Sequence, residues 1–269
     1  MLNLTDELPV DGCTLRLADT GGGGAPVLLL HGAGTDSTTF APQHEALAAA
    51  GYRVVVPDLR GHGASRPTAL PLTADRLVGD VEAVVSYLGL RRAVLVGHSL
   101  GGNLAQALVR RSPDRYRALA VLDATWSTGP LSPAERLALR SAAPVLRAFP
   151  ARSLPRLMAD ASATTGPARA ALRDVFARQT KAEFLAAWRA TVGLVAPDPG
   201  HRTPVPLLLL RGTRDRTGNI ATAMPRWAAA EAVTEVVVPD AGHVVMLDAP
   251  DAVSTALVSF LARVVDHRG

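Results

Sequence analysis

Stretches of continuously apolar residues alternate with amphipathic stretches along most of this 269-residue chain. Parallel strands that helices cover on both faces have such uninterrupted apolar runs, whereas half-exposed strands alternate apolar and polar residues. Alternation of strands with helices is typical of a parallel, doubly wound sheet. The sequence therefore predicts an α/β fold. The runs predicted as strands are residues 25–32, 52–58, 92–98, 116–124, 204–212 and 233–243, preceded by two weaker strands before Asp19.

The regular alternation stops from about Ser127 to His201. This block is rich in Ala, Arg and Pro and contains no strand-like run, so helical pieces separated by prolines and glycines fit it better. We expect a core domain of residues 1–126 and 202–269, with a helical cap of residues 127–201 inserted into it. The predicted core helices are 43–50, 74–88, 100–111, 217–230 and 251–265, and the predicted cap helices are 133–148, 154–163, 167–179 and 182–195.

Composition argues against several classes of partner. With 48% hydrophobic and 19% charged residues, the chain has an ordinary globular composition. The net charge of +4 comes from scattered arginines, so we expect no nucleic-acid surface. Cys13 is the only cysteine, and no Cys/His spacing indicates zinc. No apolar run approaches the ~20 residues that span a bilayer. We expect a cytoplasmic protein without membrane contact, metal or cofactor, as a monomer or homodimer.

Ser99 lies in VLVGHSLGGN, residues 94–103, where a predicted strand runs into a predicted helix. A serine hydroxyl becomes a good nucleophile only when a base removes its proton, and the substrate must be able to reach it. A sharp strand-to-helix turn exposes the hydroxyl, and small residues two positions before and after it relieve the crowding. Gly97 and Gly101 stand at those positions. The pattern favours a catalytic nucleophile over a plain glycine-rich turn.

A base and an acid follow later strands. His243 comes just after the last predicted strand, so its loop opens at the sheet edge where Ser99 lies and where ligands of open α/β sheets bind. Asp215 follows the penultimate strand and is the acid that we expect to hold the imidazole. Asp123, at the end of an earlier strand, is the alternative acid. The order Ser99, Asp215, His243 differs from the orders of the two common protease classes.

Backbone N–H groups must stabilise the oxyanion that forms when Ser99 attacks a carbonyl carbon. The first expected donor is Leu100, directly after the nucleophile. The second is Ala33 in the loop HGAGTDS, residues 31–37, where glycine lets the backbone approach the substrate closely. Gly34 is the alternative donor and an expected substrate contact. Further expected substrate contacts are His98, Trp126 and Trp188, with Met158, Phe176 and Phe184 as additional cap candidates.

Taken in order, LLLHGAG, VVVPDLRGHGAS, VLVGHSLGG, LLLRGTRD and VPDAGHVVMLDAP resemble successive landmarks of the α/β-hydrolase fold superfamily, in particular its serine esterases and enol-lactonases. The match covers nearly the whole chain outside residues 127–201. The resemblance implies an eight-stranded, mostly parallel sheet with helices on both faces and a helical cap. It also implies the triad Ser99, Asp215 and His243, which agrees with the reading of the residues themselves.

Serine at position 99 narrows the chemistry that this resemblance implies. Haloalkane dehalogenases and epoxide hydrolases of the fold carry Asp at that position, and dienelactone hydrolases carry Cys. We therefore expect a serine hydrolase that cleaves a carboxylic ester or lactone of a small, largely apolar substrate through an acyl-enzyme on Ser99. A thioesterase, a cofactor-free perhydrolase and a slow-turnover ligand receptor remain open as alternatives.

Overall fold

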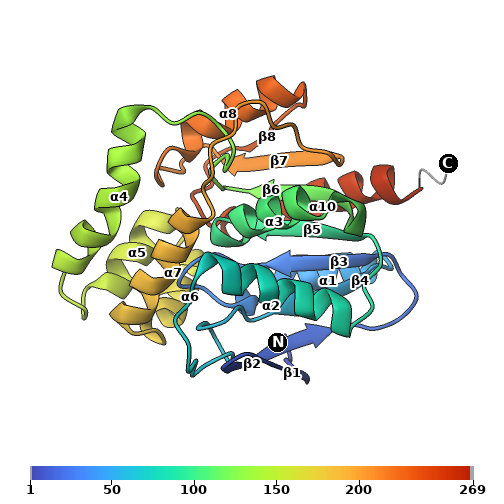
Figure 1. Cartoon of the computed structure of the whole chain (residues 1–269), viewed down its shortest axis with the longest axis horizontal. Helices are drawn as coiled ribbons and strands as arrows, with labels where there is room; N and C mark the ends of the chain where they lie inside the picture. The colour runs from blue at the N-terminus through green and yellow to red at the C-terminus, as the bar shows by residue number, and fades with distance from the viewer. Residues whose placement is uncertain (1, 267–269) are drawn as a thin grey trace.

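One eight-stranded sheet forms the centre of the computed structural model, which describes residues 2–266 (Figure 1). Two antiparallel pairings join its first three strands in space, and every other neighbouring pair is parallel. This arrangement confirms the predicted mostly parallel α/β sheet. The spatial order is β1 (Asp6–Val10), β2 (Cys13–Asp19), β4 (Arg53–Pro57), β3 (Pro26–Leu30), β5 (Ala93–His98), β6 (Tyr116–Leu122), β7 (Leu207–Gly212) and β8 (Val236–Val238).

Helices cover both faces of the sheet. Successive residues of a strand point to opposite faces, and Leu28 and Leu30 of β3 belong to one apolar cluster whereas Val27 and Leu29 belong to another. All four side chains are fully buried, which explains why the strands are apolar at every position. The first cluster includes residues of α2 (Ala74–Tyr87), α3 (Leu100–Arg111) and α8 (Ile220–Glu231), and the second includes residues of α1 (Ala41–Ala49) and α10 (Pro250–Asp266).

Four helices between β6 and β7 make up most of the predicted cap. Figure 1 shows them beside the edge of the sheet toward which the arrowheads of β3 and β7 point. Their bounds agree within two residues with the expected ranges, and the division of the chain into a core and a cap of residues 127–201 stays a prediction. The helices are α4 (Pro133–Ala148), α5 (Leu154–Ser162), α6 (Gly166–Ala177) and α7 (Lys181–Gly193).

The last part of the sheet differs from the expectation. β8 ends at Val238 instead of reaching His243, because Pro239 lacks the N–H that would continue a ladder and Asp240 has a positive φ of 57°. A short helix that the sequence did not predict, α9 (Val245–Asp248), follows His243. His243 therefore lies on a loop between β8 and α9. No helix within residues 2–266 is long and apolar enough to cross a membrane.

Candidate active site

Ser99 lies at the turn between β5 and α3 in a strained backbone conformation. Its φ of 52° and ψ of −116° belong to a region that residues with a side chain rarely adopt. The turn is also crowded, because a Cβ atom on Gly97 would overlap the carbonyl oxygen of Gly101, and one on Gly101 would overlap that of Leu30. Both glycines are therefore needed for the backbone to turn here, and the turn places Ser99 at the carboxyl edge of the sheet.

Side chains from three separate loops meet at this edge. The Nε2 atom of His243 lies 3.1 Å from Ser99 Oγ, and its Nδ1 atom lies 3.0 Å from Asp215 Oδ2. Since an ionised carboxylate can only accept a hydrogen bond, Nδ1 carries the proton and Nε2 is left to accept the proton of Ser99. The structure thus brings together the three residues that the sequence analysis grouped as a triad.

Asp215 keeps its charge although it is only 1% exposed. Burial alone raises the pKa of this carboxyl group, but the charge and hydrogen bond of His243 outweigh burial. The N–H of Thr217 donates to Asp215 Oδ1 at 2.7 Å and stabilises the same charge. Together these contacts lower the pKa of Asp215 to about 2, so the imidazole faces a carboxylate at neutral pH.

Asp123, the alternative acid, is buried at the end of β6 and does not hydrogen-bond to His243. Its Oδ1 atom accepts the N–H of Gly212 at 2.9 Å, and its Oδ2 atom has no hydrogen-bond partner in the described part of the chain. Burial, followed by the charge of Asp215, raises the pKa of Asp123 well above its usual range. The structure therefore favours a protonated, neutral Asp123 beside an ionised Asp215.

Replacing Asp123 by Asn is expected to change kcat/KM for an ester by less than about tenfold. Asn is neutral, as the protonated acid is, and it keeps an oxygen that can accept the N–H of Gly212. Steady-state kinetics on the purified variant, with a melting curve to confirm its fold, measures the effect. A loss of about 10⁴-fold in a folded variant would instead identify Asp123 as the acid of the triad.

The loop after β3 lies beside Ser99. Ala33 lines the same small cavity as Ser99, and the N–H groups of Ala33 and Leu100 donate no hydrogen bond within residues 2–266. Leu100 is the first residue of α3, so its N–H has no acceptor in the helix and shares the positive end of the helix dipole. Gly34 is not among the described residues that line this cavity, and a Cβ atom added to it would overlap the rings of Phe176 and Phe184.

His98, the residue before Ser99, supports the loop that carries His243. It is 1% exposed, and its Nε2–H donates to the carbonyl oxygen of His243 at 2.8 Å. Burial, followed by the charge of His243, lowers the pKa of His98 to about 3, so its ring is neutral. His98 is not among the described residues that line the cavity at Ser99. The expected contact of His98 with the substrate therefore has no support.

The buried neutral His98 is expected to make folding sensitive to acid. Its pKa in the folded protein lies below the unfolded value near 6.5, so between about pH 6.5 and 3 only the unfolded chain binds this proton. A His98→Gln variant keeps an N–H donor but cannot titrate. Urea unfolding at several pH values measures the free energy of unfolding. In this window, the value for wild type should fall, relative to that of the variant, by about 1.4 kcal/mol for each unit by which the pH is lowered. A difference that does not change with pH would contradict a neutral His98.

Asp248 has a structural role that the sequence analysis did not predict. Its carboxylate accepts the N–H of Gly242 at 2.8 Å and the N–H groups of Thr164 and Thr165 at 2.9 Å. It therefore joins the loop that carries His243 to the loop between α5 and α6. Only the fold brings these segments together, because Thr164 lies far from Gly242 in the sequence.

The aromatic residues that were expected to contact the substrate lie in different surroundings. Trp188 lines the cavity that contains Ser99. Trp126 is not among the described residues that line this cavity, and it stacks on Trp227 with ring centroids 6.2 Å apart. Phe176 and Phe184 meet edge to face. Within residues 2–266, no three His, Cys, Asp or Glu side chains are grouped so that they could hold a metal ion.

Sequence comparison matches residues 27–256 to the Alpha/beta hydrolase family. A dihydrolipoyllysine-residue acetyltransferase component of an acetoin cleaving system from Cupriavidus necator is 38% identical over 42% of this chain and 30% of its own length. An epoxide hydrolase from Caballeronia sordidicola is 36% identical over 45% of this chain and 37% of its own. The chain thus spans about a third of the length of these two relatives.

Two solved structures are similar over almost their whole length. A malate-bound thermophilic esterase from Thermogutta terrifontis has a TM-score of 0.77 and 28% identity, and covers 97% of this chain and 99% of its own. An enol-lactonase from Burkholderia xenovorans has a TM-score of 0.79 and 28% identity, and covers 96% of this chain and 100% of its own. This chain belongs to the Alpha/beta hydrolase family.

Proposed function

We propose that this protein is a serine hydrolase that cleaves a carboxylic ester or a lactone through an acyl-enzyme on Ser99. The observation that carries the proposal is the contact of Ser99 Oγ with an imidazole that a buried carboxylate orients. Among relatives, the epoxide hydrolase would suggest another reaction. Serine at the position where epoxide hydrolases of this fold carry Asp favours acyl transfer instead.

The proposed mechanism is a sequence of proton transfers between these contacting groups. His243 Nε2 accepts the Ser99 proton while Oγ attacks the carbonyl carbon, and Asp215 stabilises the imidazolium that results. The N–H groups of Leu100 and Ala33 hold the negatively charged oxygen. His243 then gives the proton to the leaving alkoxide oxygen as the C–O bond breaks. A water molecule next gives a proton to His243 and attacks the acyl carbon. His243 then returns this proton to Ser99 Oγ as the bond from Oγ to the acyl carbon breaks, which releases the acid and restores Ser99.

The first test is hydrolysis of p-nitrophenyl esters from acetate to decanoate by the wild-type protein. We expect kcat/KM of about 10⁴ M⁻¹s⁻¹ or more for the best ester, within the range of ordinary enzymes. The chain length at which it peaks reports the size of the space next to Ser99. A folded protein that cleaves none of these esters but opens an epoxide would contradict the proposal.

A further inference from the structure

Three cavities meet at Leu139 of α4 and Trp188 of α7, and these two side chains border all three. The cavity at Ser99 has a volume of about 50 Å³, which has room for the reacting group but not for a whole substrate. The two other cavities have volumes of about 410 Å³ and about 400 Å³. A substrate whose carbonyl lies at Ser99 would extend into these larger spaces.

The cavity of about 410 Å³, which we call the aliphatic cavity, shares Thr217 and Gly218 with the cavity at Ser99. Glu135 carries the only carboxyl group among the lining residues that the structure describes. Hydrogen bonds from the side-chain amide of Asn219 and the N–H of Ser132 lower the pKa of Glu135 to about 2, so it is negatively charged. An apolar group gains from burial there, whereas a carboxylate is repelled. The apolar lining residues are Ala138, Leu139, Val145, Leu146 and Met158.

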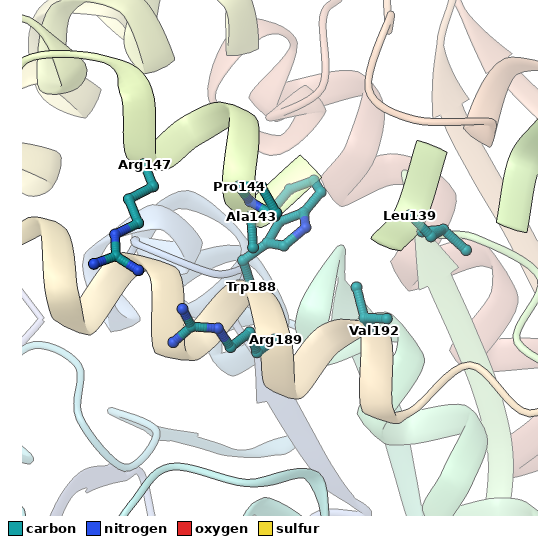
Figure 2. A pocket seen from close by; sticks show the side chains of 7 residues that line it. All are labelled: Leu139, Ala143, Pro144, Arg147, Trp188, Arg189 and Val192. Atoms are coloured by element: carbon teal, nitrogen blue, oxygen red, sulfur yellow. The ribbon is translucent and has the colours of Figure 1, made fainter. Parts of the chain in front are cut away.

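The cavity of about 400 Å³, which we call the arginine cavity, lies between α4 and α7 (Figure 2). Among the lining residues that the structure describes, Arg147 and Arg189 are charged and none is acidic. Figure 2 shows both arginines on one side of Trp188, with Leu139 and Val192 on the other. Leu139 and Val192 also border the cavity at Ser99. The arginine cavity therefore has an end near the nucleophile and a positively charged end away from it.

Arg147 and Arg189 have unused hydrogen-bonding capacity. Neither guanidinium group forms an ion pair or a hydrogen bond with any residue that the structure describes, whereas other arginines of the cap do. Arg173 pairs with Asp160 at 2.6 Å, and Arg178 pairs with Asp36 at 3.1 Å. Guanidinium groups bind carboxylates through paired, charge-assisted hydrogen bonds. Two guanidinium groups without a partner among the described residues therefore make this end of the cavity suited to a carboxylate.

The charge of the cap favours the same kind of ligand. Residues 127–201 contain ten basic and five acidic residues, a net charge of +5, whereas the whole chain carries only +4. The rest of the chain is therefore slightly negative. Since side chains of α4 and α7 line the cavity at Ser99, the charge of residues 127–201 attracts anions to the side of the molecule where the reaction would take place.

We infer that the substrate is an ester with one apolar arm, held in the aliphatic cavity, and one carboxylate-bearing arm, held by Arg147 and Arg189. This inference rests on the proposed function and narrows its substrate class. Trp188 contributes a further donor between the two arms, because its buried Nε1–H has no hydrogen-bond partner in the described part of the chain.

Three chromogenic esters test this inference. 4-Nitrophenyl hexanoate is neutral, 3-carboxy-4-nitrophenyl hexanoate carries the carboxylate on the leaving group, and the 4-nitrophenyl monoester of glutaric acid carries it on the acyl group. Each is assayed at low salt with wild type and with an Arg147→Gln/Arg189→Gln double variant. Both arginines are exposed, so this variant is expected to fold. Arg152→Gln is the matched control, because Arg152 is an exposed cap arginine that borders none of the three cavities.

The double variant should lose about tenfold or more in kcat/KM for one of the two anionic esters, mainly through KM, which is the effect of removing a charged contact in binding. It should change kcat/KM for the neutral ester by less than about twofold, and the Arg152→Gln variant should match wild type on all three. Equal losses for neutral and anionic esters, or no loss for either anionic one, would overturn the inference and leave the proposed function standing. If the folded wild type cleaved none of the three, both would fail.

Discussion

Replacing Ser99 by Ala should lower kcat for the best p-nitrophenyl ester by a factor on the order of 10⁴ to 10⁶, with little change in KM. The hydroxyl is the only group of the protein that forms a covalent bond to the acyl carbon in the proposed mechanism, so its loss removes the acyl-enzyme route altogether. The remaining groups still bind the ester and its oxyanion, which explains why some rate above that of water is expected to survive.

Stopped assays at high enzyme concentration can measure such a slow variant, and its melting curve should stay within a few degrees of wild type. The strained φ of 52° belongs to the backbone and not to the hydroxyl, so alanine at this position keeps the same turn. A folded Ser99→Ala protein with near wild-type turnover would contradict the assignment of the nucleophile.

Replacing Asp215 by Asn should lower kcat by about 10⁴-fold. The amide of Asn can donate to Nδ1 of His243, which would leave Nε2 protonated and unable to accept the proton of Ser99. Since the pKa of Asp215 is about 2, its carboxylate is ionised at every pH from about 4 upward, so the variant removes a negative charge throughout that range. Initial rates from pH 6 to 9 measure the effect.

The Asp123→Asn variant is the matched control for this experiment, because it makes the same chemical change in a neighbouring buried carboxyl group. Only the Asp215 variant should be strongly impaired, since of the two acids only Asp215 hydrogen-bonds to His243. If both variants were equally impaired, the two acids would act as a unit and the separate roles given to them here would be wrong.

The sequence predicts the fold well where the signal is local. Residues such as Val27 to Leu30 are buried from both sides, so an uninterrupted apolar run identifies their strand without any knowledge of its neighbours. Ser99 is equally readable, because the crowding that requires Gly97 and Gly101 arises within five consecutive residues and from the adjacent strand. Asp215 and His243 could be placed beside it because parallel strands end at a common edge.

Contacts between distant segments could not be read from the sequence. The bond from His98 to the carbonyl oxygen of His243 depends on how the last loop folds back over β5, and no local pattern records it. Trp126 and Trp188 were both expected to contact the substrate, but only the fold shows that Trp126 stacks on Trp227. The early end of β8 follows from Pro239 and Asp240, whose effect depends on the pairing with β7.

Trapping the acyl-enzyme tests the central claim most directly. Wild-type protein is mixed with excess p-nitrophenyl ester, quenched in acid during turnover and digested, and mass spectrometry locates the acyl group. Acylation of Ser99 alone, absent from the Ser99→Ala variant treated in the same way, is the predicted result. Turnover with the acyl group on another residue, or acylation that persists in that variant, would contradict a mechanism through Ser99.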